Sequence, residues 1–227
     1  MLPGKAMNEI QTKCRQCGTC CLKGGPALHI EDLAIIRSGK LPVNSLITIR
    51  KGELAHDPLT GRVQAVAYEL VKICGTAREW RCFYYAAGKG CTMYALRPSA
   101  CRVLKCWDPD EILARIGKDL LTRLDILAVG DPLRLLVEEH ERLCPCPDME
   151  LIRDALLADS LHDLAELQRL VDADLGFRDQ VVKAHDLPLA EELFCFGRPI
   201  FQLLQAVGLG ITGTAAGIKL SLSEKTQ

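Results

Sequence analysis

The sequence predicts an α+β protein with a cysteine-rich N-terminal half and a mostly α-helical C-terminal half. Nine of the 12 cysteines lie before residue 107, among glycine-containing turns and short extended stretches. Amphipathic helical patterns, separated by helix start and stop signals, fill the rest of the chain. We therefore expect a first region over 1–107 and a helical region over 108–227. The sequence leaves open whether the second region packs on the first as one unit.

The first region begins with a short helix and an extended stretch. A helical pattern over 30–38 ends at Gly39, which suits a helix terminus. The segment 57–60 carries turn signals, and residues 62–73 then follow a pattern typical of extended chain. These elements surround the cysteines with short, turn-rich structure.

A β-hairpin and a further short helix are expected before residue 107. Residues 80–85 and 91–95 predict the two hairpin strands, joined by the glycine-containing segment 86–90. Pro98 suits the first turn of a helix that carries Cys101.

The helical region begins at a strong start signal. Asp108 is a suitable N-cap, and Pro109 fits the first helical position. An apolar face then predicts one helix over 108–127; it comprises Ile112, Leu113, Ile116, Leu120, Leu121, Leu124 and Leu127. Further helices are expected at about 132–143, 148–158, 161–175 and 188–196.

The stretch from Pro199 to Ile218 carries no charged residue and is long enough in principle to span a bilayer. Polar residues and glycines dilute its hydrophobicity, however. We therefore expect a buried helix over about 200–207 followed by a glycine-rich tail, and no membrane span.

Bulk properties exclude some partners and suggest a compartment. The formal net charge is −1 and the pI is about 6.5, so no basic footprint indicates nucleic-acid binding. The N-terminus lacks the apolar run of a secretory signal peptide, which predicts a cytoplasmic location. Cysteines kept reduced there are expected to bind metal or to react, rather than to form disulfides.

Four cysteines packed into eight residues are the most informative feature: Cys14, Cys17, Cys20 and Cys21. Thiolates at this density repel one another and invite oxidation, and the segment has no apolar period. A soft metal ion holds several thiolates at one point and neutralises their charge. The segment therefore predicts a metal site that also stabilises its own loop.

A second group of cysteines, Cys82, Cys91, Cys101 and Cys106, raises the number of candidate metal ligands to eight. Eight thiols suffice for one site with spare ligands or for two sites of four. In an extended segment Cys20 and Cys21 point opposite ways, so we expect them to serve different metals or one of them to lie outside the ligand shell. Three cysteines at two-residue gaps with a distant fourth favour an iron–sulfur cluster over zinc or mononuclear iron.

Other residues near the candidate ligands have alternative roles. Arg97 and Arg102 bracket Cys101 and are expected either to offset thiolate charge or to lie on the surface. Asp32 could bind iron or stabilise its own helix, and the second role is favoured. The sequence leaves open whether Cys144 and Cys146 are ligands. Cys74 and Cys195 are expected to be structural, and Tyr94 is expected in the core. His29 is the histidine nearest the cluster.

The run C-x2-C-x2-C-C, followed by C-F and G-C-x2-Y-x2-R-P-x2-C-R, resembles the YkgJ-type CxxCxxCC cysteine-cluster family over residues 12–106. This resemblance implies a zinc- or iron-chelating domain. The same cysteine pattern occurs in flagellin lysine methylases, which implies S-adenosylmethionine-dependent methyl transfer as an alternative.

Three functions are thus considered. The first is a metal-binding protein with a structural, redox or metal-handling role. The second is an enzyme related to the methylases. The third is a metal-stabilised module whose C-terminal helices bind a protein partner.

Overall fold

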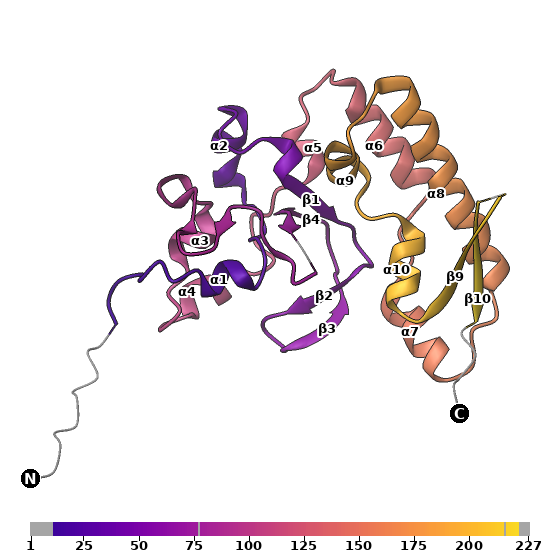
Figure 1. Cartoon of the computed structure of the whole chain (residues 1–227), viewed down its shortest axis with the longest axis horizontal. Helices are drawn as coiled ribbons and strands as arrows, with labels where there is room; N and C mark the ends of the chain where they lie inside the picture. Colours follow the sequence, from indigo (N-terminus) through magenta and orange to yellow (C-terminus); the bar gives the residue numbers. More distant parts are fainter. Residues whose placement is uncertain (1–10, 77, 216, 223–227) are drawn as a thin grey trace, which may run out of the picture.

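The computed structural model describes residues 11–76, 78–215 and 217–222 (Figure 1). It confirms an α+β protein with short antiparallel hairpins and helices concentrated in the C-terminal half. The helices are α1 (Thr19–Leu22), α2 (Leu33–Arg37), α3 (Ser99–Val103), α4 (Asp110–Leu113), α5 (Arg123–Ile126), α6 (Pro132–Leu143), α7 (Met149–Leu157), α8 (Leu164–His185), α9 (Leu189–Phe196) and α10 (Ile200–Ala206). The strands are β1 (Leu46–Ile49), β2 (Leu54–Asp57), β3 (Arg62–Ala65), β4 (Leu70–Ile73), β5 (Gly75–Thr76), β6 (Arg81–Cys82), β7 (Tyr85–Ala86), β8 (Gly90–Cys91), β9 (Leu209–Thr214) and β10 (Gly217–Leu222).

Strands β1 and β4 form the centre of the cysteine-rich half. They pair antiparallel with Leu46 opposite Ile73, and every residue of β1 is buried. Both strands are rich in β-branched residues, which favour a pleated conformation. Helix α9 packs on β1, where the Thr48 hydroxyl donates to the Phe194 carbonyl oxygen at 2.6 Å. The cysteine-rich half is thereby joined to the C-terminal helices.

The hairpin predicted between 80–85 and 91–95 is confirmed at its turn, where Tyr85 pairs with Cys91, but its first strand does not continue back to residue 80. Strand β6 pairs with β5 instead, and β7 pairs with β8. A Cβ atom on Gly75 would lie 1.7 Å from the Trp80 ring, so the absent side chain leaves room for the indole. The chain reverses at Trp80, whose φ is 55°, and returns along β5.

The single helix predicted over 108–127 is wrong, because α4 and α5 replace it. The chain leaves the helical conformation at Gly117, with φ of 74°, and at Asp119, with φ of 49°. The Leu121 backbone N–H then donates to the Leu28 carbonyl oxygen at 3.0 Å. Hydrogen bonding to a distant segment therefore overrides the local apolar period.

The start signals of the later helices are confirmed. Asp131 caps α6 by accepting the Leu133 backbone N–H at 2.9 Å, and Asp148 caps α7 in the same way. Helix α8 begins at Leu164 and continues to His185, well past the end predicted at residue 175.

A β-hairpin occupies the C-terminal stretch for which we expected a glycine-rich tail. The buried helix is confirmed as α10, and β9 and β10 then pair antiparallel. The Gln168 side chain of α8 donates to the Ile218 carbonyl oxygen at 2.9 Å and accepts the Leu220 backbone N–H at 2.8 Å. Among the described helices, none is both long and apolar enough to cross a membrane.

Two clusters of buried apolar side chains stabilise the molecule. The first joins β1 and β4 to residues of α6, α8 and α9. The second, which we call the C-terminal core, comprises Cys144, Met149, Ile152, Leu167, Val171, Ile200, Leu203, Leu204, Leu209 and Leu220. Figure 1 shows the helices of this core at the end of the molecule away from α1 and α3.

Candidate metal centre

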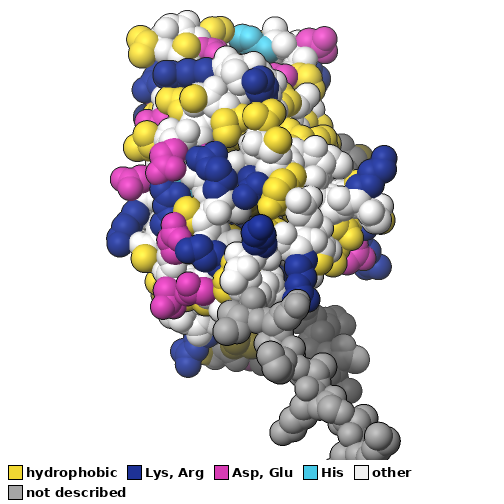
Figure 2. Space-filling view, turned by 90° about the vertical axis from the view of Figure 1, so that its left-hand side faces the viewer, with side chains coloured by type: hydrophobic (Ala, Val, Ile, Leu, Met, Phe, Trp, Pro, Cys, Tyr) yellow, Lys and Arg dark blue, Asp and Glu magenta, His cyan; other side chains and the backbone are white. Residues whose placement is uncertain are grey.

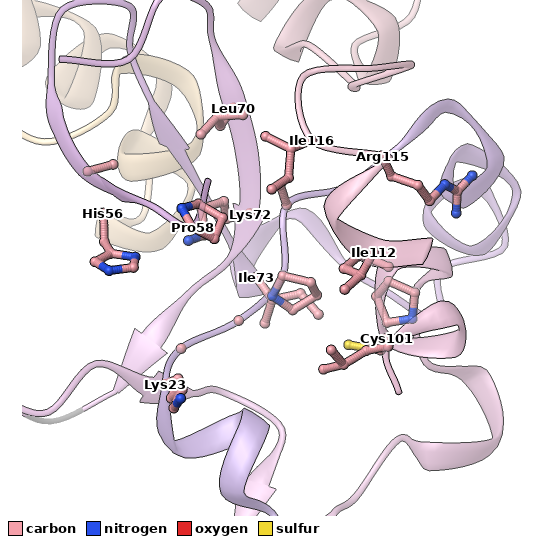
Figure 3. A pocket seen from close by; sticks show the side chains of 18 of the residues that line it. Lys23, His56, Pro58, Leu70, Lys72, Ile73, Cys101, Ile112, Arg115 and Ile116 are labelled. Carbon is pink, nitrogen blue, oxygen red and sulfur yellow. The ribbon is translucent and has the colours of Figure 1, made fainter. Parts of the chain in front are cut away.

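Five of the eight predicted ligands line one cavity of about 580 Å³. Cys20 and Cys21 come from α1, Cys82 from β6, Cys91 from β8 and Cys101 from α3. Figure 3 shows the cavity from close by, with the Cys101 sulfur at its edge. We call these five residues the thiol wall.

Two glycines let the N-terminal cysteine segment lie against the β7–β8 hairpin. Gly18 has φ of 79°, and a Cβ atom there would lie 2.4 Å from the Tyr85 ring. At Gly90, with φ of 74°, a Cβ atom would lie 2.5 Å from the Gln16 carbonyl oxygen. Both positions therefore need glycine for its backbone freedom and for the close approach. These contacts bring the cysteine cluster next to β8.

Cys20 and Cys21 lie in one helical turn, which corrects the extended segment that we expected. Adjacent side chains on a helix diverge by about 100°, whereas those on a strand diverge by about 180°. Both thiols can therefore face the same cavity, and both line it.

Burial and mutual proximity disfavour the thiolate form in the thiol wall. Burial, followed by the proximity of Cys20, Cys82 and Cys91, raises the pKa of Cys101 to about 12. Burial also raises the pKa of Cys21 above its ordinary value of 9.0, with Cys20, Cys91 and Cys82 as further causes. A bound cation would offset this repulsion and stabilise the thiolates. The donor set therefore fits a soft metal.

The separation of the sulfur atoms bears on which metal fits. Four thiolates bound to one zinc ion at about 2.3 Å lie roughly 3.8 Å apart. Among the described residues, the group of candidate ligand atoms that all lie within 4.8 Å of one another is His140, Cys144 and Asp174, outside the thiol wall. The five thiols of the thiol wall line one cavity without being gathered as tightly as this group.

The other three predicted ligands, Cys14, Cys17 and Cys106, are exposed and do not line the cavity. Cys14 forms a hydrogen bond with the Tyr94 side chain, which raises the pKa of that hydroxyl. Hydrogen bonds from Thr19 lower the pKa of Cys17, so this thiol ionises more readily than a free cysteine. The structure thus brings five candidate ligands together and leaves three at the surface nearby.

Asp32 positions the helix that carries Cys101. Its fully buried carboxylate accepts the Ser99 backbone N–H at 2.7 Å and the Ser99 hydroxyl at 3.1 Å. It also accepts the His29 backbone N–H at 3.0 Å, closing its own 3₁₀ turn. Both carboxylate oxygens are used in this way, which supports the structural alternative for Asp32.

Arg97 and Arg102 bracket Cys101, and their hydrogen bonds go to backbone carbonyl groups. Arg97 donates to the Tyr94 carbonyl oxygen at 2.9 Å, and its guanidinium lies 4.0 Å from the centre of the Tyr94 ring. Arg102 donates to the Arg97 carbonyl oxygen at 3.1 Å and lies 3.7 Å from Glu31. The two positive charges therefore stay close to the thiol wall.

Cys144 lies beside a buried histidine–aspartate pair that the sequence analysis missed. His140 Nε2 lies 2.7 Å from Asp174 Oδ1, and all three residues are fully buried. Arg178 Nε donates to the same Asp174 oxygen at 2.9 Å and balances its charge. We therefore assign this group to the fold. The signal in the sequence was the four-residue spacing of His140 and Cys144 at the end of α6.

The remaining cysteines lie outside the cavity lining. Burial raises the pKa of Cys195 to about 12 and that of Cys146 to about 12, so both thiols stay protonated. Burial also raises the pKa of Cys74, a half-buried residue near Cys82. Cys74 therefore offers a control thiol close to the thiol wall.

Comparison with known families supports the metal-binding class. Residues 13–118 match the CxxCxxCC family model, described as "Putative zinc- or iron-chelating domain". This match over the cysteine-rich part of the chain supports metal binding. No curated protein and no solved structure matches the chain.

Proposed function

We propose that the chain binds an iron–sulfur cluster through the thiol wall and serves a redox role in the cytoplasm. The observation that carries this proposal is the convergence of five thiols, from four separate elements, on one cavity. Such a cluster, when bound, supplies one-electron transfer. The protein supplies the thiolates and the charges around them.

Two features favour a cluster over a single zinc ion. Cys14, Cys17 and Cys20 follow one another at two-residue gaps, a spacing that iron–sulfur proteins use, and this feature counts if Cys14 and Cys17, which lie outside the cavity lining, join Cys20 as ligands. The thiol wall also offers five thiols, one more than a zinc ion with four bonds can bind.

The surroundings of the thiol wall are compatible with electron transfer. Cys20 is exposed, so a partner can approach this end of the cavity. Arg97 and Arg102 lie beside Cys101 and would favour the more negative, reduced state of a thiolate-bound cluster.

The exposed cysteines enter the proposal as further ligands. Cys14, Cys17 and Cys106 are candidates for a second site or for exchange with members of the thiol wall, because eight thiols suffice for two sites of four. The metal-to-protein ratio separates these cases. A protein partner for the C-terminal helices and a methyl-transfer activity both stay predictions.

The test is metal and sulfide analysis together with an absorption spectrum, on protein purified without oxygen. We expect iron and acid-labile sulfide in equal amounts and a brown colour that dithionite bleaches. Cys101→Ser should lose most of the colour, whereas the control Cys74→Ser should keep it. Colourless protein with stoichiometric zinc would contradict the cluster, and equal colour in both variants would contradict the assignment of Cys101.

A further inference from the structure

The cavity beside the thiol wall has a second wall that is apolar. Leu70 and Ile73 come from β4, and Ile112 and Ile116 come from α4 and the turn after it. Figure 3 shows these four side chains around the cavity. They come from two chain segments that lie far apart in the sequence. The volume of about 580 Å³ lies within the range of small-molecule sites. An apolar body of several carbon atoms can therefore be buried here.

Lys72 projects into this apolar cavity from the middle of a sheet. The side chains of β4 alternate in burial: Val71 and Ile73 are buried, whereas Leu70 and Lys72 are partly accessible. Residue 72 pairs with Ile47 of β1 on one side and forms a bridge with Ala27 on the other. The backbone at Lys72 is therefore fixed from both sides, which gives its side chain a rigid origin.

Within the part of the chain that the structure describes, no acidic side chain pairs with the ammonium group of Lys72. Among the described residues, none forms a hydrogen bond or an ion pair with its side chain, and the charge that acts on it is that of another cation, Arg198. Burial lowers the pKa of Lys72, because the charged form loses contact with water. Lys72 is partly buried, so its ammonium group is only partly hydrated and would be stabilised by an anion bound beside it.

The other charged groups of the cavity do not supply that anion. Asp57 is the acidic residue of the lining, and its oxygens accept hydrogen bonds from the Leu59 backbone and the Gln64 side chain. Arg115 pairs with Glu31 outside the cavity. Figure 2 shows Lys and Arg side chains spread over this end of the molecule, with Asp and Glu side chains among them.

We propose that the cavity binds a small organic carboxylate with an apolar body, whose carboxylate pairs with Lys72. Lys23 also lines the cavity, but Lys72 is the ammonium group on β4 beside the apolar wall, so we choose a singly charged carboxylate as the group that meets it. The apolar body would lie against Leu70, Ile73, Ile112 and Ile116. This site adds a ligand on the apolar side of the cavity, which it shares with the thiol wall, and its argument rests on Lys72 and the apolar side chains rather than on the identity of the metal.

Calorimetric titration of the purified, metal-containing protein with octanoate and with its neutral analogue octanamide tests the site at pH 7. The two probes share the apolar chain and differ in the charge that Lys72 would meet. We expect octanoate to bind about tenfold more tightly, the typical effect of one charge-assisted hydrogen bond. Equal affinities, or no binding of octanoate, would overturn the proposal.

Two lysine variants test whether the preference for octanoate over octanamide comes from Lys72. Lys72→Met should abolish the preference for octanoate and leave octanamide affinity within about twofold. The control Lys40→Met, at an exposed position outside the cavity lining, should keep the preference. An unchanged preference in Lys72→Met would overturn the role of this residue. Metal content is measured in each variant, so that loss of the metal site and loss of the carboxylate site are told apart.

Discussion

The thiol wall and the C-terminal core are built on opposite principles. Around the thiol wall the strands β5, β6, β7 and β8 have two residues each, and α1 buries none of its residues. In the C-terminal core, α8 has 22 residues and β9 and β10 have six each. Apolar burial can stabilise the second region, whereas the first has too little of it and needs bonds to a metal.

Metal removal should give the largest difference in amide-exchange protection between the thiol wall and the C-terminal core. We expect a chelator under reducing conditions to lower the amide-exchange protection of residues 78–106 by at least about 100-fold, because metal binding stabilises this segment. Protection in α8 and in β9–β10 should persist. Hydrogen exchange followed by mass spectrometry measures both segments in one sample, and unchanged protection around the thiol wall after complete metal loss would remove the contrast.

A mutation that creates a cavity in the C-terminal core should lower the stability of the protein and leave its metal content unchanged. Leu204 in α10 is fully buried, so Leu204→Ala is expected to lower the free energy of unfolding by about 2–5 kcal/mol. Metal content per folded chain should stay unchanged. Leu157→Ala, at a position that is 76 % exposed, is the control and should have little effect. Urea unfolding and metal analysis decide the matter, and metal loss in Leu204→Ala would show that the regions are not separable.

Gly18 is expected to affect both stability and metal binding, because its close contact with Tyr85 positions the cysteine cluster. Gly18→Ala is expected to destabilise the protein by more than the roughly 1–2 kcal/mol of a left-handed residue and to speed metal loss, since the new Cβ meets the Tyr85 ring. Gly88→Ala is matched, with φ of 75° and nothing within 4 Å of its Cβ. Retained metal after dialysis should fall in the first variant alone. Equal behaviour of the two variants would contradict the positioning role.

The smallest expected effect is the pH dependence of the C-terminal core. Burial lowers the pKa of His140 below its ordinary value of 6.5, although Asp174 opposes this shift. The folded protein therefore binds fewer protons at His140 than the unfolded chain does. The contribution of His140 to stability should be constant above pH 6.5 and fall as the pH drops below that value. His140→Gln should flatten this part of the profile in urea unfolding at several pH values; an identical slope would contradict it.

Local signals in the sequence were sufficient to predict features that depend on neighbouring residues, such as helix starts. Helices α6 and α7 begin close to the predicted residues 132 and 148, and Pro98 precedes the helix that carries Cys101, whereas Asp108 does not cap α4. The density of Cys14, Cys17, Cys20 and Cys21 was enough to predict a metal-binding region.

Long-range pairing could not be predicted from the local pattern. The apolar face over 108–127 fits a helix, yet Leu121 bonds to Leu28 and breaks it. The segment after α10 forms β9 and β10 because it packs on α8, where Gln168 binds its backbone. The thiol wall likewise depends on α1, which the glycine-containing cluster did not indicate as helical. These features come from tertiary contacts that a single sequence does not reveal.

The central claim is that sulfur atoms of the thiol wall share one iron–sulfur cluster. X-ray absorption at the iron edge of the oxygen-free protein tests it most directly. We predict a first shell of sulfur neighbours and a second shell of iron, both reduced in amplitude in Cys101→Ser. An iron shell of oxygen and nitrogen alone, or a zinc edge with four sulfur neighbours and no iron, would contradict the claim.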